Sequence, residues 1–554
     1  MVAPRHFVSP SILLAACLIS VPASRAAIPA DQLERGAKIF TEKCQLCHQP
    51  SGQGAPPVYP PLANSDWFKT NRERVIKALC EGLSGPISVN GQNYSNVMPA
   101  QMLDDKQVAD VLSYVGNSWG GEAPEFTLEE VRAARSKTQF VTYADLLKSA
   151  AFQPLPKAPT GWTLRELVQL PEFCTRLAGD GSDKHVYALA QNGAVYMVDT
   201  TQGAMSPIIK ASDYIDPKRG EYVALGCTLD PQGRLLVVTN QMLINDVPVY
   251  TNEVVIWRTV GPVRDDDSRK LEPWFTMSYP RGVGGFNHGV SHMAFGPDGK
   301  LYVSSGSRTD GGETTTDPHY FGGAEVDTTA CLWRIDPSAA KPQLEVIARG
   351  IRNAYGFAWD GNGNLFTVAN GPDASSAEEM DLIEVGKHYG FPYQFADWPV
   401  KAGFPYKHTP PPPAGIQFTL PVVNVGPAAG GSEEKPLFTF DPHSSPAGTI
   451  WCGEQYPAPL RGGFLITRFG NLLGAPAAPE DVGFDVLSAH LEKRKDGGWL
   501  ARTTSVLAPL GRPLDLLPIG GGRILILEYT RSINFKQKIG WLPGRILELA
   551  PGKP

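Results

Sequence analysis

The sequence has no excess of positive charge and no polybasic tail. Its 554 residues include 50 Lys and Arg against 56 Asp and Glu, which gives a formal net charge of −6. Proteins that bind nucleic acid usually carry a basic arm or patch, so we expect no nucleic-acid partner. The hydrophobic fraction of 42% is that of an ordinary globular protein.

The first residues lack an apolar run long enough for a membrane span, which needs about 20 residues. The run SILLAACLISV follows Arg5 and His6 and precedes PASRAA. This order predicts a signal peptide over residues 1–26, cleaved near Ala26. Alternatively, LAAC ending at Cys17 is a lipoprotein signal, and the acylated Cys17 would be a membrane anchor. Both interpretations export the chain, so the expected location is the periplasm.

Cysteine is scarce outside one motif. Of eight cysteines, Cys17 lies in the signal segment and two lie in the motif CQLCHQP at residues 44–50. The other five leave at least one free thiol, and their pairing stays open; they are Cys80, Cys174, Cys227, Cys331 and Cys452.

The motif CQLCHQP has the C-x-x-C-H spacing that attaches haem c. Cys44 and Cys47 would bond the haem vinyl groups, and His48 would ligate the iron. A bare C-x-x-C also occurs in zinc and redox sites, but the export signal and a suitably placed methionine favour haem. The second axial ligand is expected to be Met98 in SNVMPAQ, with Met102 as the alternative.

The segments beside these residues have helical spacing. DQLERGAKIFTEKC precedes the motif and DDKQVADVLSYVGNSW follows Met98. The order helix, C-x-x-C-H, Met-Pro, helix resembles class I cytochromes c over residues 30–120. We assign residues 27–122 to a small all-α cytochrome c domain, and the charged and proline-rich residues 123–159 to a linker.

From about residue 160 the sequence consists of short strands between glycine turns. Hairpin patterns recur six times, for example CTLDPQGRLLVVTN, MAFGPDGKLYVSSG and FAWDGNGNLFTVANG. Six units over residues 160–554 give about 65 residues each, enough for four-stranded blades of ~40 to 50 residues with long loops. We therefore predict an all-β six-bladed β-propeller. The alternative is a seventh blade within residues 395–440.

Polar residues at the ends of these hairpins are the candidates for chemistry. His288 and His292 precede or begin one hairpin, Arg352 and Asn353 enter another, and Arg468 and Arg512 lie beside two more. A histidine that titrates near neutrality can act as a base. Arginines that converge on one axis indicate a polyanionic ligand.

The spacing of these residues resembles the soluble sugar dehydrogenases that depend on pyrroloquinoline quinone (PQQ), including sorbosone dehydrogenase-like members, over residues 160–550. This resemblance implies a six-bladed propeller in which His288 is the catalytic base. It implies that Arg352 and Asn353 contact the quinone. Gly371 and Pro372 would bind its calcium through backbone carbonyls.

Further residues follow the family pattern with departures. The resemblance implies a second calcium near Glu379 and Tyr389, the latter within HYGFP. Arg512 matches the first of two late arginines, and Arg468 lies near the family's lysine. The sequence departs from the family pattern at two positions: Leu514 stands in place of the second arginine, and Ser307 in place of the aspartate that orients the base. One further candidate, His443, is expected to face the substrate. Either Asp310 replaces that aspartate, or His288 is held in another way.

The combined expectation is a quinohaemoprotein oxidoreductase. It would oxidise an aldose or a sugar aldehyde with PQQ and calcium, and pass electrons to its haem c. The haem would then reduce a downstream periplasmic cytochrome or terminal oxidase. Two alternatives stay open: a calcium-dependent lactonase-type hydrolase, and a propeller that only binds or senses a ligand.

Overall fold

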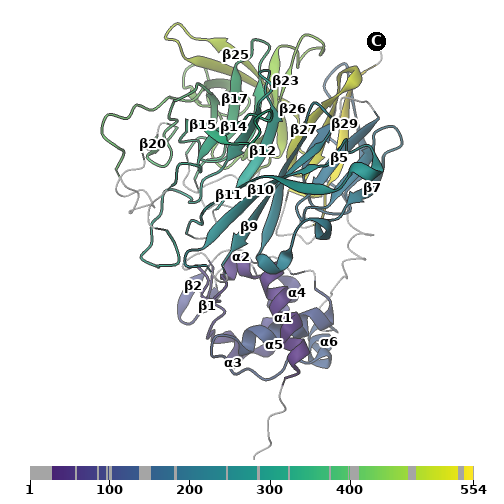
Figure 1. Cartoon of the computed structure of the whole chain (residues 1–554), viewed down its shortest axis with the longest axis vertical. Coiled ribbons are helices and arrows are strands. Elements are labelled where there is room, and N and C mark those ends of the chain that lie inside the picture. Colours follow the sequence, from purple (N-terminus) through teal and green to yellow (C-terminus); the bar gives the residue numbers. More distant parts are fainter. Residues whose placement is uncertain are drawn as a thin grey trace, which may run out of the picture.

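The computed structural model has a small helical domain beneath a large β-propeller (Figure 1). It describes residues 28–552 except 56–58, 84–86, 95–97, 99–100, 102, 137–150, 180–183, 245–246, 284–286, 322–324, 373–375, 397, 400–410, 472–481 and 534–541. The predicted signal segment with Cys17, and Met102, lie outside the described residues. No helix among the described residues is long and apolar enough to cross a membrane.

The N-terminal domain packs short helices around an apolar core. The helix α5 (Asp105–Asn117) begins at a capping box between Asp104 and Gln107, and it packs across α1 (Ala30–Lys43). Its other elements are α2 (Gln45–His48), α3 (Trp67–Thr70), α4 (Arg72–Glu81), β1 (Ile87–Val89) and β2 (Gln92–Tyr94). The domain is helical as predicted, with the addition of the β1–β2 hairpin.

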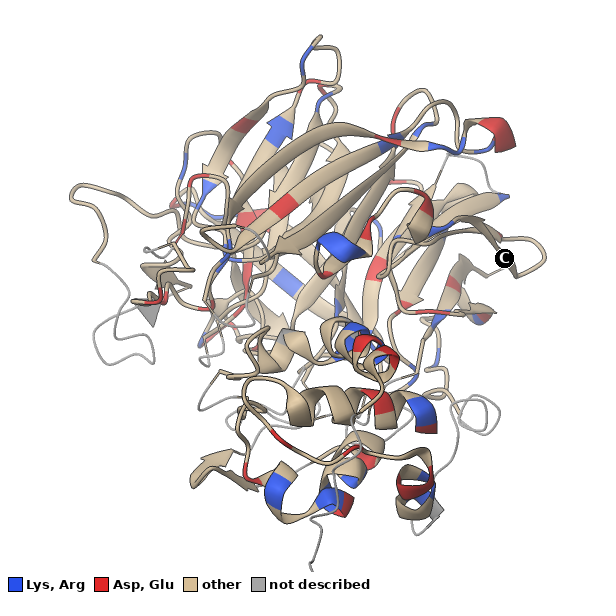
Figure 2. Cartoon of the chain, turned by 60° about the horizontal axis from the view of Figure 1, so that its bottom comes forward, with Lys and Arg blue, Asp and Glu red and all other residues tan. Residues whose placement is uncertain are grey.

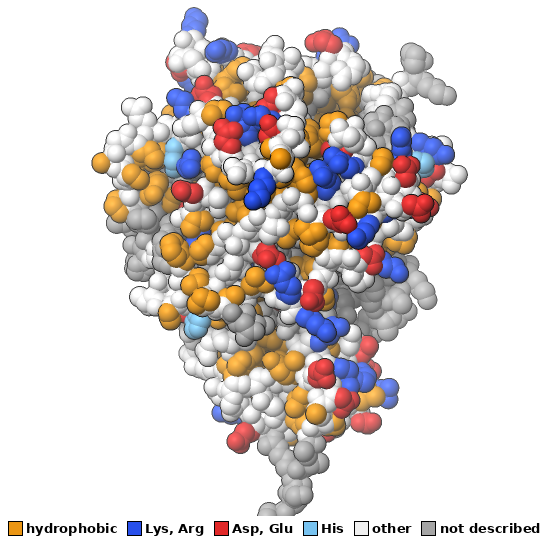
Figure 3. All heavy atoms as spheres, in the orientation of Figure 1, with side chains coloured by type: hydrophobic (Ala, Val, Ile, Leu, Met, Phe, Trp, Pro, Cys, Tyr) orange, Lys and Arg blue, Asp and Glu red, His pale blue; other side chains and the backbone are white. Residues whose placement is uncertain are grey.

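Charges of both signs lie along these helices (Figure 2). Several are paired, such as Arg35 with Asp110 at 2.6 Å and Lys77 with Glu73 at 3.0 Å. On the whole molecule, charged side chains of both signs are scattered among apolar ones over the face in Figure 3. This surface agrees with the near-balanced composition.

The segment assigned to the linker divides between the two domains. Its helix α6 (Leu128–Ser136) places Val131 and Ala134 in the apolar core of the helical domain. Residues 151–159 lie instead on the propeller, where Phe152 faces the guanidinium groups of Arg531 and Arg545 at 4.3 and 4.6 Å. The propeller therefore fixes its own end of the linker.

Six antiparallel sheets form the blades, which confirms the predicted fold. The first three are four-stranded. Blade 1 contains β4 (Cys174–Gly179), β5 (His185–Ala190), β6 (Val195–Asp199) and β7 (Ala204–Ile209). Blade 2 contains β8 (Tyr222–Leu229), β9 (Leu235–Leu243), β10 (Thr251–Thr259) and β11 (Leu271–Pro280). Blade 3 contains β12 (Val290–Phe295), β13 (Leu301–Ser305), β14 (Cys331–Ile335) and β15 (Leu344–Arg349).

The last three blades are less regular. Blade 4 contains β16 (Ala354–Trp359), β17 (Leu365–Ala369) and β18 (Glu379–Leu382). Blade 5 contains β23 (Pro446–Cys452), β24 (Gly463–Arg468), β25 (Asp485–Lys493) and β26 (Trp499–Leu507), then β21 (Val423–Pro427) and β22 (Leu437–Phe438). Blade 6 contains β27 (Pro513–Ile519), β28 (Arg523–Glu528), β29 (Arg545–Pro551) and β3 (Trp162–Gln169).

Two features of this arrangement show that the propeller has six blades and not seven. The inner strands β4, β8, β12, β16, β23 and β27 contact one another in a closed ring. Residues 395–440 do not form a seventh blade in their described part. Instead β21 pairs in parallel with β26 and widens blade 5, while β19 (Gln394–Phe395) and β20 (Trp398–Pro399) form a small hairpin.

The turn chemistry explains why the hairpins are readable in the sequence. In the turn DPQG, Gly233 has φ +75°, a conformation that glycine adopts without strain. The side chain of Asp230 accepts hydrogen bonds from the backbone N–H groups of Gln232 and Arg234, both at 2.9 Å. The turn DGNG in blade 4 repeats this arrangement with Asp360 and Gly363.

A buried ion pair ties the inner strands together at the propeller axis. Arg176 of β4 contacts Asp515 of β27 at 3.1 Å, and both side chains are buried. Its guanidinium also donates to the carbonyls of Leu225 and Tyr355, on β8 and β16. One side chain therefore joins four blades.

Candidate functional site

The helical domain contains an apolar pocket between the predicted haem ligands. His48 and Met98 both line it, as does Cys44. The Nδ1 atom of His48 lies 2.9 Å from the carbonyl oxygen of Pro60, which orients the ring and leaves Nε2 for a metal. Burial lowers the pKa of His48 and so favours the neutral imidazole that binds iron.

The second ligand position is held by backbone pairing. Met98 exchanges two hydrogen bonds with Leu83, at 2.8 and 3.0 Å, and its side chain packs against the apolar core. These residues fit a haem bonded at Cys44 and Cys47, with His48 on one face and Met98 on the other. Three of the four predicted haem residues, Cys44, His48 and Met98, therefore line one pocket.

The predicted propeller residues lie just before the inner strands or near the ends of the second strands. Both kinds of position are on the same face of the ring. We call this the axial face. Gly306 lies beside His288 and Asn353, because a Cβ atom there would come within 2.5 Å of the His288 Cβ and 2.9 Å of the Asn353 Oδ1. His288 and Asn353, from blades 3 and 4, are thus neighbours.

His288 is held by Ser307. The Nδ1 atom of His288 lies 3.1 Å from both the carbonyl and the hydroxyl oxygen of Ser307, and the His288 N–H donates to the same carbonyl at 2.9 Å. An Nδ1–H that donates to this carbonyl leaves the Nε2 lone pair available to accept a proton. Burial, followed by the charge of Arg352, lowers the pKa of His288 to about 3, so the imidazole is neutral at pH 7.

Asp310 does not take the place of the missing aspartate. It pairs with Arg352 at 2.5 Å, and both side chains are only 3% exposed. Arg352 also donates to the carbonyl oxygens of Asp310 and Asn370, at 2.8 and 3.1 Å. The ring of His288 is therefore oriented by Ser307 and not by a carboxylate. This agrees with the second expected alternative, in which His288 is held in another way.

His292, the other histidine of this segment, lies deeper along the axis. Its ring meets Phe357 edge-on at 4.4 Å, and burial with the nearby Arg176 lowers its pKa well below the usual value. It belongs to the packed axis, whereas His288 lies at the entrance of β12.

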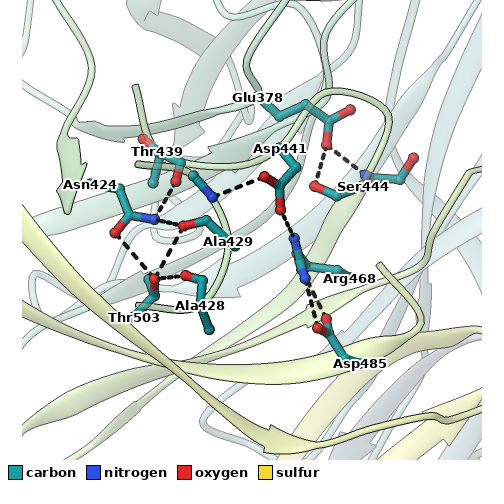
Figure 4. A network of polar contacts seen from close by, with 12 residues as sticks. Glu378, Asn424, Ala428, Ala429, Thr439, Asp441, Ser444, Arg468, Asp485 and Thr503 are labelled. Atoms are coloured by element: carbon teal, nitrogen blue, oxygen red, sulfur yellow. Dashed lines mark hydrogen bonds and ion pairs between the residues drawn. The ribbon is translucent and has the colours of Figure 1, made fainter. Parts of the chain in front are cut away.

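The two later arginines hold loops of the axial face. Figure 4 shows Arg468 between two carboxylates, Asp485 at 2.6 Å and Asp441 at 2.9 Å. Arg512 donates to the carbonyls of Gly470, Asn471 and Ile533, and it lies between the rings of Phe469 and Phe484. Their predicted contact with an anionic cofactor stays a prediction.

Family comparisons agree with this geometry. Residues 33–119 match the family model of cytochrome c, and residues 259–470 match that of glucose/sorbosone dehydrogenase. Over 113 residues the chain is 40% identical to cytochrome c-552 of Thermus thermophilus, which covers 18% of this chain and 85% of that protein. The N-terminal domain belongs to the cytochrome c family. Within the propeller, residues 259–470 are those that match the glucose/sorbosone dehydrogenase family.

Two other similarities are partial. The cytochrome c domain is 32% identical over 92 residues to the cytochrome c subunit of a quinone alcohol dehydrogenase from Gluconacetobacter polyoxogenes, spanning 16% of this chain and 19% of that protein. The dehydrogenase domain is similar to the PQQ-bound aldose sugar dehydrogenase of Streptomyces coelicolor, with 18% identity and a TM-score of 0.46 over 71% of this chain and 99% of that one.

The region of the predicted second calcium contains two buried carboxylates on one face of β18. Glu379 and Asp381 are both fully buried, and the Glu379 Oε2 and both Asp381 carboxylate oxygens have no hydrogen-bond partner. Burial raises the pKa of Glu379, and Asp381 raises it further. Buried oxygens without partners fit a divalent cation such as calcium.

The other residues predicted to bind calcium are less available as ligands. The Tyr389 hydroxyl donates to the Leu382 carbonyl at 2.6 Å and accepts from the Glu384 N–H at 2.8 Å, so this side chain is used within the protein. Beside Gly371, the buried Ser376 hydroxyl has no hydrogen-bond partner. Within the described ranges, no three His, Cys, Asp or Glu side chains cluster as a metal site, so any calcium here would also need backbone carbonyls.

Sequence reasoning missed Glu378 and Asp381. Glu378 accepts hydrogen bonds from the Ser445 N–H at 2.5 Å and the Ser444 hydroxyl at 3.1 Å, which fixes the loop that carries His443. Burial raises the pKa of Glu378 to about 8. The signal for Asp381 was the alternation of acidic residues in EEMDL, since residues two apart share one face of a strand.

Proposed function

We propose that this protein oxidises an aldose sugar or a sugar aldehyde with PQQ and calcium, and passes the electrons to its own haem c. The observation that carries the proposal is a neutral histidine, His288, oriented by Ser307 beside buried Arg352 and Asn353. A cytochrome c domain in the same chain can accept the electrons.

His288 acts as the base. Its Nε2 accepts the proton of the substrate hydroxyl while the hydrogen on the same carbon leaves as hydride. The product is a lactone from a cyclic aldose, or an acid from a hydrated aldehyde. PQQ, when bound, supplies the hydride acceptor, and calcium polarises its reactive carbonyl.

The protein's own residues place the reaction. Arg352 and Asn353 would contact the quinone on the side of His288. Arg512 and Arg468 would face its carboxylates, although Asp441 and Asp485 already offset the charge of Arg468. Gly371 and Pro372 offer backbone carbonyls to the calcium of the quinone, and Glu379 with Asp381 holds a second calcium. An anionic cofactor beside Arg352 offsets that cation and thereby raises the pKa of His288 toward a useful value.

The cytochrome c domain receives the electrons one at a time. Cys44 and Cys47 would bond the haem, and His48 and Met98 would ligate its iron. The proposed location is the periplasm, with membrane attachment only if Cys17 is acylated. The proposed acceptors are a periplasmic cytochrome or a terminal oxidase.

The test is reconstitution of the full-length chain with PQQ and calcium, followed by addition of an aldose panel. We expect sugar-dependent reduction of the haem, seen as a rise of the reduced α-band. The protein without PQQ is the matched control and should stay oxidised. Hydrolysis of a lactone without haem reduction would favour the lactonase alternative instead.

A further inference from the structure

The haem-bearing helix contacts one segment of the propeller rim. The Tyr320 hydroxyl lies 3.4 Å from the side-chain oxygen of Gln49, which directly follows His48. Tyr320 lies near the end of a stretch that begins at Ser307, and we call residues 307–321 the blade-3 segment. A hydrogen bond of this length is weak, and the half-buried Tyr320 ring packs edge-on against the Tyr250 ring.

The other end of the blade-3 segment is the axial site itself. Ser307 holds His288, and the next residue, Arg308, donates from its guanidinium to the Phe321 carbonyl at 2.8 Å. The Arg308 guanidinium also lies 5.6 Å from the Phe321 ring. Bonded contacts therefore run from His288 through Ser307, Arg308 and residues 320–321 to Gln49.

The blade-3 segment is also fixed internally. The buried carboxyl of Glu325 accepts from the Thr309 hydroxyl at 2.5 Å and from the Arg308 N–H at 3.0 Å. Asp310 is tied to Arg352. Residues 306–312 are all buried, so the inner half of the segment has little freedom to move.

A second set of contacts supports Tyr320 from blade 2. The Tyr250 ring meets the Tyr320 ring edge-on at 5.2 Å, and the Arg281 N–H donates to the Tyr250 carbonyl at 2.7 Å. The buried Arg281 guanidinium acts electrostatically on both Tyr320 and Glu221.

We propose that the blade-3 segment is the route by which electrons pass from the axial site to the haem, with Tyr320 as the residue that positions the haem-bearing helix α2. This inference rests on the proposed function. The two-electron-reduced quinone gives one electron to each of two successive ferric haem states and releases two protons to water. Each ferrous haem is reoxidised by an external one-electron acceptor, such as ferricyanide in the test.

The experiment uses the full-length protein loaded with PQQ and calcium, with glucose as the probe substrate. Tyr320→Ala should slow haem reduction by roughly tenfold or more and leave turnover with a phenazine dye within about twofold, since small misplacements of reacting groups are costly. Tyr320→Phe, which removes only the hydroxyl that contacts Gln49, should also slow haem reduction, by less than Tyr320→Ala. The haem midpoint potential should stay at the wild-type value in both variants.

Tyr214→Ala is the matched control. Tyr214 is also half-buried, meets the Trp257 ring edge-on at 5.2 Å and donates from its hydroxyl to the Gly193 carbonyl at 2.6 Å, and both of these partners belong to the propeller. Both rates should be unchanged in this variant. If Tyr320→Ala reduces its haem as fast as the wild-type protein, the electrons take another route and the inference is wrong.

A readout without substrate separates this inference from the proposed function. Hydrogen exchange over residues 47–53 should be faster in oxidised Tyr320→Ala than in the oxidised wild-type protein, because α2 loses its contact. Unchanged exchange would overturn the docking contact. Failure of wild-type protein to reduce either dye or haem with any aldose would count against the proposed function, and the exchange result would still decide the contact.

Discussion

The buried pair of Arg352 and Asp310 allows the most quantitative prediction. Arg352→Met removes three hydrogen bonds, two to Asp310 and one to the Asn370 carbonyl. It leaves the Asp310 carboxylate at 3% exposure without its cation. Loss of one partner of a buried ion pair costs about 3–5 kcal/mol, so the free energy of unfolding of the propeller should fall by that amount.

The measurement is guanidinium chloride unfolding, followed by tryptophan fluorescence for the propeller and by Soret absorbance for the cytochrome c domain, because the two domains need not unfold together. The matched control is Arg494→Met. Arg494 pairs with Asp496 at 2.7 Å, but the two side chains are 40% and 58% exposed. Its loss should cost at most about 1 kcal/mol.

The double variant Arg352→Met/Asp310→Asn should recover part of the lost stability, because no unpaired charge remains buried. An Arg352→Met protein no less stable than Arg494→Met would refute the reasoning. The same Arg352 variant should bind PQQ more weakly by about 2 kcal/mol or more, since a charge-assisted hydrogen bond is lost.

Three further predictions concern other residues. Met98→Ala should remove the sulfur-to-iron absorption band and lower the haem potential, and a normal band in this variant would favour Met102 instead. His288→Ala should reduce sugar-dependent turnover ~100 to 10,000-fold while haem reduction by ascorbate continues, and near-normal turnover would move the base to His292. Burial raises the pKa of Glu325 to about 7, so the folded state binds a proton that the unfolded state releases, and stability should fall as the pH rises from about 4.3 to 7. Glu325→Gln should flatten the dependence of the unfolding free energy on pH. An equally steep dependence would show that another group than Glu325 causes it.

The sequence was most informative where a motif is contiguous. Cys44, Cys47 and His48 are close along the chain, and the hairpins show glycine turns with asparagine or aspartate before them. These local signals were enough for the haem cavity and the six blades. The first hairpin pattern read from the sequence, VYALAQNGAVYMV at residues 186–198, covers β5 and β6 and not the inner pair β4 and β5, although GDGSD between β4 and β5 is also rich in glycine and aspartate.

Pairings between distant residues could not be read from the sequence. Arg468 was expected to face a ligand, but Asp441 and Asp485 are brought to it by folding. The role of Ser307 required knowledge that its carbonyl and hydroxyl converge on one imidazole nitrogen. The helix α6 has an ordinary amphipathic pattern, and only packing shows which domain it joins.

The strand β3 has a consequence for the biogenesis of the protein. It supplies the outer strand of blade 6 by pairing with β29, so Arg545 lies opposite Gln169 across the sheet. The ring of blades can close only after the last strand has been synthesised, and pairings this distant in sequence form slowly. The cytochrome c domain has its own core and needs no part of the propeller for it. Haem attachment to the cytochrome c domain can therefore precede closure of the propeller ring.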